Sequence, residues 1–239
     1  MRKGLAYDSD EGRNFAAAIT SLMTANAYES SADMAKNLGT FTHFEFNKEP
    51  MIEVMEKHRR NLDDIVWDYV PKDLKKATTK AWDNVVRRGR KVGFRNAQAT
   101  VIAPTGTISY LMGNDTTGPE PALSLIYMKD LAGGGSIELV TREIPNALKN
   151  LGYNEFQIKD ISKYIGDTNK AIGAPHLNPD HYKVFATAFG NAKGEGSIPF
   201  EGHVRMLGAM QPFVSGAISK TNNLPEEATV KEVFDGYKL

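Results

Sequence analysis

The sequence predicts an α/β fold in which helices are followed by buried strands. Two runs have strand character: Ala99 to Ala103 includes the β-branched residues Thr100, Val101 and Ile102, and a later run from Ala217 reads AISKT. Longer stretches between and around them repeat their apolar residues at helical spacing. The repeated order of helix then strand indicates a segment of an α/β barrel with parallel strand pairing.

The composition is that of a globular protein. The 239 residues suffice for one large or two small domains, and 29 basic residues balance 29 acidic ones, so we expect neither nucleic acid nor an anionic membrane as partner. No apolar run reaches the roughly 18 residues that span a bilayer, and the first residues lack the apolar core of a secretion signal. We therefore expect a cytoplasmic location. The absence of cysteine excludes disulfides and thiol chemistry in this chain.

Three helices are predicted before the first strand, at residues 8–39, 47–60 and 71–92. Asp8 with Glu11 three residues later is the pattern of a capping box, and Gly39 is a typical helix end. In the first helix we expect the large apolar residues at helical spacing to face the core: Phe15, Ile19, Leu22, Met23, Met34 and Leu38.

Basic residues gather at the ends of the second and third helices, where positive charge suits the helix dipole. We interpret His58, Arg59 and Arg60 as a solvated helix end. The basic run from Arg87 to Lys91 fits either a solvated helix end or a group that steers phosphate towards the following strand.

The PTGTIS stretch after the first strand predicts a small-residue turn that leads into a helix near Thr107. The unpaired amides at a helix start attract anions, Gly106 lets the backbone approach a ligand closely, and Pro104 fixes one dihedral. The hydroxyls of Thr105, Thr107 and Ser109 can donate further hydrogen bonds. The turn therefore fits a phosphate site, and it equally fits an ordinary strand-to-helix joint with capping threonines.

A loop, NDTTGPEPAL, follows the turn. Its Asn, Asp, Gly and Pro content excludes a strand interior. Glu120 lies between Pro119 and Pro121, so its position should be well fixed, and loops of this kind often carry binding groups. Asn114 and Asp115 are explained equally well by turn capping.

Further helices are predicted at residues 136–151, 154–165, 198–213 and 226–237, the second of them starting at a capping box of Asn154 and Gln157. No metal site is expected, because His176 and His181 do not share a helix face and no cysteine or paired carboxylate completes a ligand set. Lys220, at the end of the AISKT run, either meets an anion or lies at the surface.

Three motifs, in this order, resemble ribonucleotide reductases: RNAQATVIAPTGTIS at 95–109, GNDTTGPEP at 113–121 and GHVRMLGAMQPFVSGAISKTNNLP at 202–225. The similarity is closest to the adenosylcobalamin-dependent class and extends from about Gly4 to the end of the chain. It implies the C-terminal portion of a ten-stranded α/β barrel of the ribonucleotide reductase type. Residues 1–239 would form a partial barrel domain that lacks the cysteine-bearing N-terminal part.

The resemblance implies reduction of ribonucleoside di- or triphosphates by a cysteine radical, which adenosylcobalamin starts in this class. The implied partners are the ribonucleotide substrate, an upstream chain or segment with the catalytic cysteine, a thiol reductant and, as one arrangement, a homodimer of the complete enzyme. Because this chain has no cysteine, it carries no catalytic residue, and we expect it to be inactive alone.

By position in the family's motifs, the substrate phosphate would be held, largely through backbone amides, by Pro104, Thr105, Gly106, Thr107 and Ile108. Further pocket candidates are Ser109, Asn114, Asp115 and Glu120. Two other functions fit the same residues: a nucleotide or phosphate binder without catalytic activity, and a structural or assembly fragment that binds no ligand.

Overall fold

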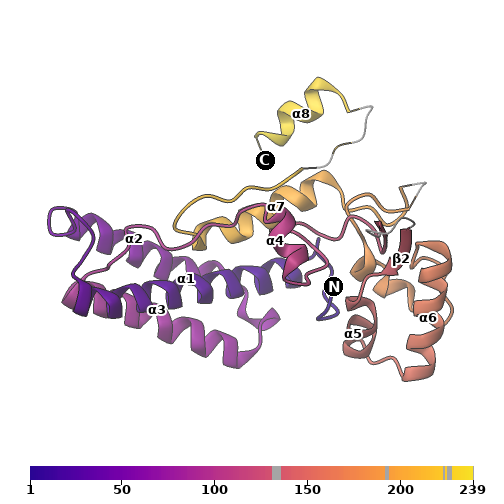
Figure 1. The fold of residues 1–239 in the computed structure, drawn as a ribbon, viewed down its shortest axis with the longest axis horizontal. Coiled ribbons are helices and arrows are strands. Elements are labelled where there is room, and N and C mark those ends of the chain that lie inside the picture. The colour runs from indigo at the N-terminus through magenta and orange to yellow at the C-terminus, as the bar shows by residue number, and fades with distance from the viewer. Residues whose placement is uncertain (131–135, 192–193, 223, 225–227, 239) are drawn as a thin grey trace. The chain divides into compact units, whose positions relative to one another are not determined.

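The computed structural model describes residues 1–130, 136–191, 194–222, 224 and 228–238. The chain divides into two compact units, which we describe separately (Figure 1). The first unit comprises residues 1–12, 104–205 and 220–239, and the second comprises residues 13–103 and 206–219. None of the helices that the structure describes has the length and apolar character needed to cross a membrane.

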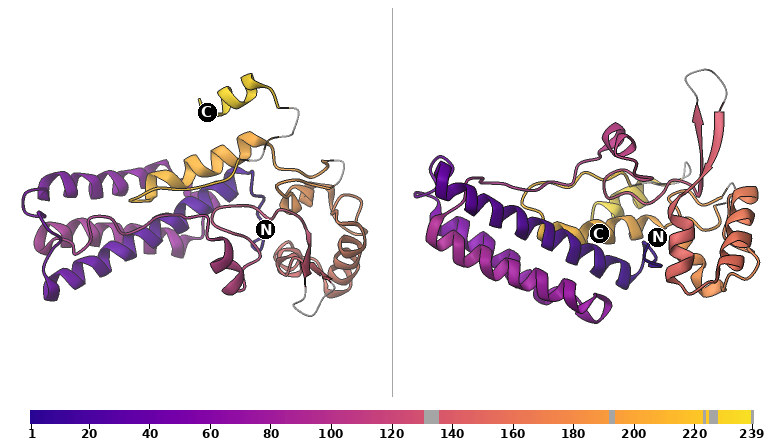
Figure 2. Two further views of the ribbon diagram at one scale, coloured as in Figure 1. Left: turned by 45° about the horizontal axis from the view of Figure 1, so that its top comes forward. Right: turned by 60° about the horizontal axis from the view of Figure 1, so that its bottom comes forward.

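The second unit is helical, and its long helices lie side by side in Figures 1 and 2. Its elements are α1 (Asp10–Leu38, after the first turn), α2 (Lys48–Arg60), η1 (Asn61–Asp64), η2 (Trp67–Tyr69), α3 (Lys72–Val92) and η4 (Gln211–Phe213). The core surrounds Trp82 of α3, whose Nε1 donates to Ser21 Oγ of α1 at 2.8 Å. Gly93 ends α3 with φ 73° and ψ −165°, a backbone conformation that is readily adopted by glycine and seldom by other residues.

The start and the buried face of α1 differ from the sequence-based expectation. Gly12 N donates to Ser9 Oγ at 3.0 Å, so Ser9 rather than Asp8 caps the helix. The face turned to the core is made mostly of small residues: Ala17, Ala18, Thr20, Ser21, Thr24, Ala25, Tyr28, Ser31, Ala32 and Ala35. Ile19, Met23, Met34 and Leu38 are instead exposed, at 42 to 64%. Small side chains let the neighbouring backbone come close to α1. This close packing decides which face of the helix is buried, rather than the spacing of the large apolar residues.

Polar residues on this small-residue face hold the extended segment that follows α3. Ser31 Oγ accepts from Asn96 N at 2.8 Å, and Tyr28 Oη donates to Ala97 O at 3.1 Å. The hydroxyls of Thr24 and Thr100 lie 2.9 Å apart. The polar positions of α1 therefore fix the chain that leads into the PTGTIS turn.

The two predicted strand runs pair in parallel, but only briefly. Ile102 bridges to Ile218, with Ile102 N donating to Ala217 O at 3.0 Å and Ser219 N donating to Ile102 O at 2.9 Å. Ser215 Oγ accepts from the amides of Ala99 and Thr100 and thereby ends the ladder on one side. The expected strands are present as one parallel bridge between extended segments.

The first unit contains a two-stranded sheet and several short helices. Its elements are α4 (Gly106–Leu111), β1 (Ile126–Asp130), β2 (Ser136–Val140), α5 (Glu143–Asn150), α6 (Glu155–Thr168), η3 (Pro179–Phe185), α7 (Phe200–Met210, as far as Arg205) and α8 (Val230–Gly236). Its core includes Ile144 and Leu148 of α5 and Ile161 and Ile165 of α6. The capping box of Asn154 and Gln157 is confirmed at the start of α6.

The helix predicted from Ser136 is wrong over its first five residues. They form β2, which pairs antiparallel with β1 in the register Ile126↔Val140 to Asp130↔Ser136 and is seen as a hairpin ribbon in Figure 2. The SIELV sequence alternates polar and apolar residues, the period of a strand. Pro145 is accommodated in the first turn of α5, where a missing amide hydrogen costs little.

The described residues do not form a barrel. Their only named sheet is the β1–β2 hairpin, and parallel pairing is limited to the isolated bridges Ile102↔Ile218 and Thr187↔Ser197. Extended parallel pairing is therefore not found among the described residues. A barrel closes only when each strand has a partner on both sides.

Candidate functional site

The PTGTIS turn lies in the first unit and has an unusual backbone at Thr105. This β-branched residue has φ 47°, in the left-handed region that such residues seldom adopt. Its hydroxyl oxygen accepts from Gly118 N at 2.7 Å and from Ser109 Oγ at 2.9 Å. Strained backbone of this kind persists where surrounding contacts impose it, and it is frequent at binding sites.

The first amides of α4 are free to bind a ligand. Those of Gly106, Thr107 and Ile108 have no hydrogen-bond partner among the residues that the structure describes, whereas Ser109 N donates to Thr105 O at 3.1 Å. A Cβ atom added at Gly106 would meet no atom within 4 Å. The open side of the turn is therefore not filled by neighbouring side chains.

Ser109 differs in part from expectation. Its hydroxyl donates to Thr105 Oγ1, inside the turn, so that hydrogen is not offered to a ligand. Because the Thr105 oxygen accepts two hydrogen bonds, the hydrogen of its own hydroxyl remains available. Of the three hydroxyls expected to donate, those of Thr105 and Thr107 keep that capacity.

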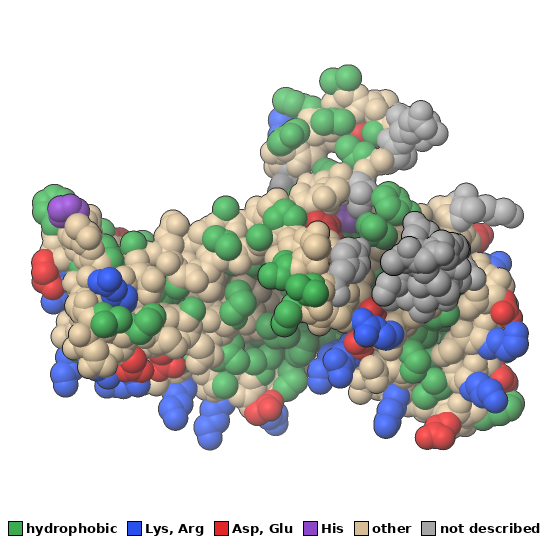
Figure 3. Space-filling view, in the orientation of Figure 1, with side chains coloured by type: hydrophobic (Ala, Val, Ile, Leu, Met, Phe, Trp, Pro, Cys, Tyr) green, Lys and Arg blue, Asp and Glu red, His purple; other side chains and the backbone are tan. Residues whose placement is uncertain are grey.

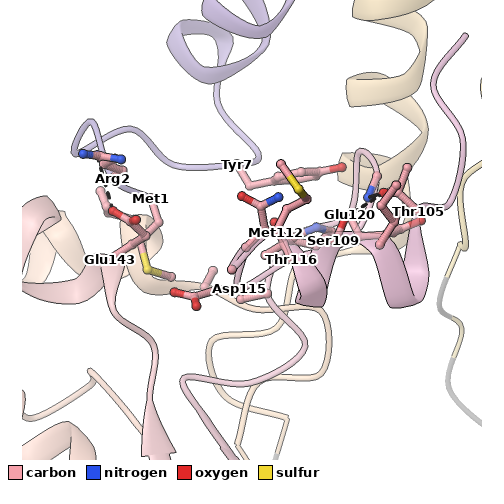
Figure 4. A pocket seen from close by; sticks show the side chains of 18 residues that line it. Met1, Arg2, Tyr7, Thr105, Ser109, Met112, Asp115, Thr116, Glu120 and Glu143 are labelled. Carbon is pink, nitrogen blue, oxygen red and sulfur yellow. Dashed lines mark hydrogen bonds and ion pairs between the residues drawn. The ribbon is translucent and has the colours of Figure 1, made fainter.

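A cavity of about 760 Å³ opens beside this turn (Figure 4). Six of the nine site residues suggested by the sequence line it: Thr105, Ile108, Ser109, Asn114, Asp115 and Glu120. Pro104, Gly106 and Thr107 belong to the same turn but do not line the cavity. The structure thus brings the turn and the polar loop together around one space.

Asp115 has a structural contact. Its carboxylate accepts from Arg142 N at 3.0 Å and from Arg142 Nε at 3.1 Å, and its side chain is 6% exposed. Arg142 also donates from Nη2 to Gly113 O. Since Arg142 immediately precedes α5, this pair ties the loop to the start of that helix.

Glu120 belongs to a buried ionic cluster. Lys220 Nζ lies 2.6 Å from Glu120 Oε2, and Thr221 N donates to Glu120 Oε1 at 2.7 Å. The Lys220 side chain is 0% exposed, so the alternative of a surface lysine is wrong. Burial lowers the pKa of Lys220, and the contact with Glu120 opposes this shift.

His203 and Tyr7 complete the surroundings of Glu120. His203 Nδ1 lies 2.7 Å from Lys220 Nζ, so it accepts, and the ring proton lies on Nε2. Burial and the charge of Lys220 lower the pKa of His203, which favours this neutral form. Tyr7 Oη donates to Pro119 O at 2.8 Å, and burial raises the pKa of Tyr7.

The sequence reasoning missed Tyr7, Arg142 and His203. Tyr7 contacts the polar loop across 112 residues and Arg142 contacts it across 27, whereas His203 contacts Lys220, the partner of Glu120. No local pattern marks Tyr7 or His203. For Arg142 the local signal is its position directly before a helix whose first turn holds an acid, because a helix start commonly has a side-chain contact.

The cavity is equipped to bind and orient a polar ligand. Its lining includes hydroxyls and an amide side chain together with the acids Asp115, Glu120 and Glu143. The described residues contain no group of three His, Asp or Glu side chains that could hold a metal ion. The chain has no thiol. The lining therefore combines hydrogen-bonding groups with acids, and the chain provides no cysteine that could carry a radical.

Comparison with known sequences identifies relatives along the whole chain. Residues 1–238 match the family described as "Ribonucleotide reductase, barrel domain". A protein of Streptomyces coelicolor named "Vitamin B12-dependent ribonucleotide reductase" is 48% identical over 99% of this chain. Proteins of the same name from Rhodopirellula baltica and Streptantibioticus cattleyicolor are each 45% identical, over 99% and 100% of this chain.

The chain spans only a part of these relatives. It covers 24% of the Streptomyces coelicolor protein, 23% of the Rhodopirellula baltica protein and 40% of the Streptantibioticus cattleyicolor protein. Whatever the relatives do as whole proteins therefore involves other segments as well.

Proposed function

Since the chain belongs to the ribonucleotide reductase barrel-domain family, we propose that it supplies the substrate-phosphate site of a vitamin B12-dependent ribonucleotide reductase. The complete enzyme would convert ribonucleoside di- or triphosphates to deoxyribonucleotides in the cytoplasm. The chain would contribute the turn formed by Pro104, Thr105, Gly106, Thr107 and Ile108, with Ser109, Asn114, Asp115 and Glu120 around it.

The observation that carries this proposal is the set of three free amides at the start of α4. Gly106, Thr107 and Ile108 offer N–H groups that have no partner among the described residues, beside open space at Gly106. Since α4 has six residues, its dipole is small, and the attraction for phosphate would come mainly from the hydrogen bonds of these amides and of the Thr105 hydroxyl.

In the proposed reaction this chain binds and orients the nucleotide. The amides would hold the terminal phosphates, and the cavity walls would direct the ribose towards a cysteine supplied by an upstream chain or segment. Adenosylcobalamin, when bound to the complete enzyme, would start the radical. No residue of this chain is assigned to that cofactor.

We also propose that the chain is the C-terminal portion of a ten-stranded α/β barrel and that residues 1–239 are part of one domain. The parallel bridge between Ile102 and Ile218 supports this, because it joins two segments 116 residues apart in the manner of neighbouring barrel strands. A thiol reductant and a homodimer belong to the proposal for the complete enzyme.

A second function is favoured by one observation, the complete absence of cysteine. A nucleotide or phosphate binder without catalytic activity, or an assembly fragment, needs no thiol. The binder would keep the turn and its affinity for phosphate, whereas the assembly fragment would bind no nucleotide.

Replacement of Gly106 by leucine tests the phosphate site. A Cβ atom added at 106 meets no protein atom within 4 Å, so the fold should be kept while the leucine side chain fills the ligand space beside the free amides. We expect the affinity for pyrophosphate and for CDP, measured by isothermal titration calorimetry, to fall by about tenfold or more, because loss of one charge-assisted hydrogen bond costs about 1.5–3 kcal/mol.

Gly208 provides the matched control. It is an exposed glycine of α7, and an added Cβ there also meets nothing within 4 Å. Gly208→Leu should leave the affinity for both anions unchanged. Equal affinities of Gly106→Leu and the unaltered chain would refute the phosphate site.

A further inference from the structure

Lys220 lies at the centre of a buried cluster, and the proposed function gives this lysine no role. Its Nζ lies 2.6 Å from Glu120 Oε2, 2.7 Å from His203 Nδ1 and 2.7 Å from Thr221 O. An ammonium group has three hydrogens to donate, so each of them has an acceptor. Lys220 is therefore fully engaged within the protein and is not itself a ligand-binding cation.

The partner of Lys220 is an acid in the cavity wall. Glu120 lines the cavity, and its side chain is 11% exposed. Lys220 holds one carboxylate oxygen, and the amide of Thr221 holds the other at 2.7 Å. Without the ammonium, Glu120 would be a largely buried, uncompensated negative charge beside the space proposed for a phosphate.

The same contact helps to fix the loop against the turn. Three successive loop residues are each held: Gly118 N donates to Thr105 Oγ1 at 2.7 Å, Pro119 O accepts from Tyr7 Oη, and Glu120 binds Lys220. Thr105 has the strained backbone of the turn, with φ 47°. The position of Thr105 therefore depends on the loop that Lys220 anchors.

We infer that Lys220 is a positioning residue for the phosphate site: it acts through Glu120, whose negative charge it cancels, so that a polyphosphate can enter the cavity. This inference rests on the proposed function. It goes beyond the proposed function in one respect. The affinity of the cavity for an anion would depend on Lys220, which does not touch the ligand, because Lys220 neutralises the acid Glu120 in the cavity wall.

Charge-paired variants of the full chain test the inference, with pyrophosphate as the probe in isothermal titration calorimetry. Lys220→Met should weaken binding by about tenfold or more, because it leaves the Glu120 charge facing the anion. Glu120→Gln keeps an acceptor for Lys220 and removes the negative charge, so it should bind at least as tightly as the unaltered chain. In the double variant Lys220→Met/Glu120→Gln, binding should return to within about threefold of the unaltered chain.

The outcomes separate the inference from the proposed function. If the unaltered chain binds pyrophosphate and Lys220→Met binds it equally well, the inference alone is overturned. The inference is also overturned if the double variant binds as weakly as Lys220→Met, because the Lys220–Glu120 contact would then be merely structural. If Lys220→Met does not fold, the affinity of Glu120→Gln tests the inference in its place. Tenfold weaker binding of pyrophosphate by Glu120→Gln than by the unaltered chain would overturn the inference. No binding of pyrophosphate or CDP by the unaltered chain overturns the proposed function and the inference with it.

Discussion

His58 shows how the environment of one residue can reverse its expected role. The sequence placed it in a solvated helix end, but it is 8% exposed, and its ring stacks on Trp82 with centroids 5.3 Å apart. Nδ1 donates to Pro212 O at 2.7 Å, a contact across 154 residues. Arg59, next in the chain, is partly exposed and pairs with Asp83, as expected for a surface position.

We predict that His58 makes the second unit less stable in acid. Burial lowers the pKa of His58, and the hydrogen bond to Pro212 opposes this only in part. A histidine with a lowered folded pKa stabilises the fold above the unfolded pKa of about 6.5, and this contribution is lost as the pH falls below that value. The urea concentration at the unfolding midpoint of the unaltered chain should therefore be lower at pH 5.5 than at pH 7.5.

Fluorescence can isolate this effect, because the only two tryptophans, Trp67 and Trp82, lie in the second unit. His58→Gln keeps a donor for Pro212 O and does not titrate, so its midpoint should change much less over the same pH range. Equal pH dependence in the two proteins would show that His58 is not the group responsible.

Helix packing in the second unit is set by small residues. The core face of α1 is built from alanine, serine and threonine, with Ile19 and Leu38 exposed. Gly89 has the same function in α3: an added Cβ would lie 2.5 Å from Phe94 Cζ and 2.8 Å from Ile52 Cδ1. The close approach of these elements therefore depends on the absence of a side chain.

Gly89→Ala should destabilise the second unit although alanine favours a helix. The helix propensity gain is about 1 kcal/mol, whereas overpacking a buried site that cannot expand costs about 1–3 kcal/mol. Because Phe94 is 0% exposed, its ring has little room to move. We expect a net loss of up to about 2 kcal/mol in urea unfolding followed by tryptophan fluorescence.

Gly208→Ala is the control for this change, since it lies in a helix of the same unit with no atom near the added Cβ. It should raise the stability by up to about 1 kcal/mol. A Gly89→Ala protein as stable as Gly208→Ala would mean that the packing around Phe94 is looser than the structure indicates.

The chain as a whole covers about a quarter of the first relatives, 24% and 23% of their lengths. Large apolar side chains are exposed in both units, including Ile108, Leu111 and Met112 at 59 to 83%, and Figure 3 shows hydrophobic side chains over α4. Surfaces of this kind are commonly covered in a larger assembly.

We expect the isolated chain to form no deoxynucleotide from CDP or CTP, with adenosylcobalamin and a dithiol supplied, because it has no cysteine to carry the radical. Product should form when the chain is joined to, or mixed with, the cysteine-bearing upstream segment of the same enzyme. Chromatographic detection of deoxycytidine phosphates measures both. Turnover by the chain alone would contradict the proposed division of roles.

The sequence by itself determined the family, the loop at residues 113–121, and helix ends such as Gly93 and the capping box at Asn154. These features depend on a few neighbouring residues, or on motifs that persist whatever the chain packs against. The sequence also grouped the turn at residues 104–109 with Asn114, Asp115 and Glu120. Six of these nine residues line one cavity.

Only the tertiary structure decided what is paired with what. Lys220 and Glu120 are 100 residues apart, and His58 and Pro212 are 154 apart. Contacts between residues so far apart in the chain produce no periodicity or spacing that can be recognised in a local stretch of sequence, and neither does the burial that results from them. For the same reason the runs predicted as barrel strands form only one parallel bridge, because a strand exists only where another segment supplies its hydrogen bonds.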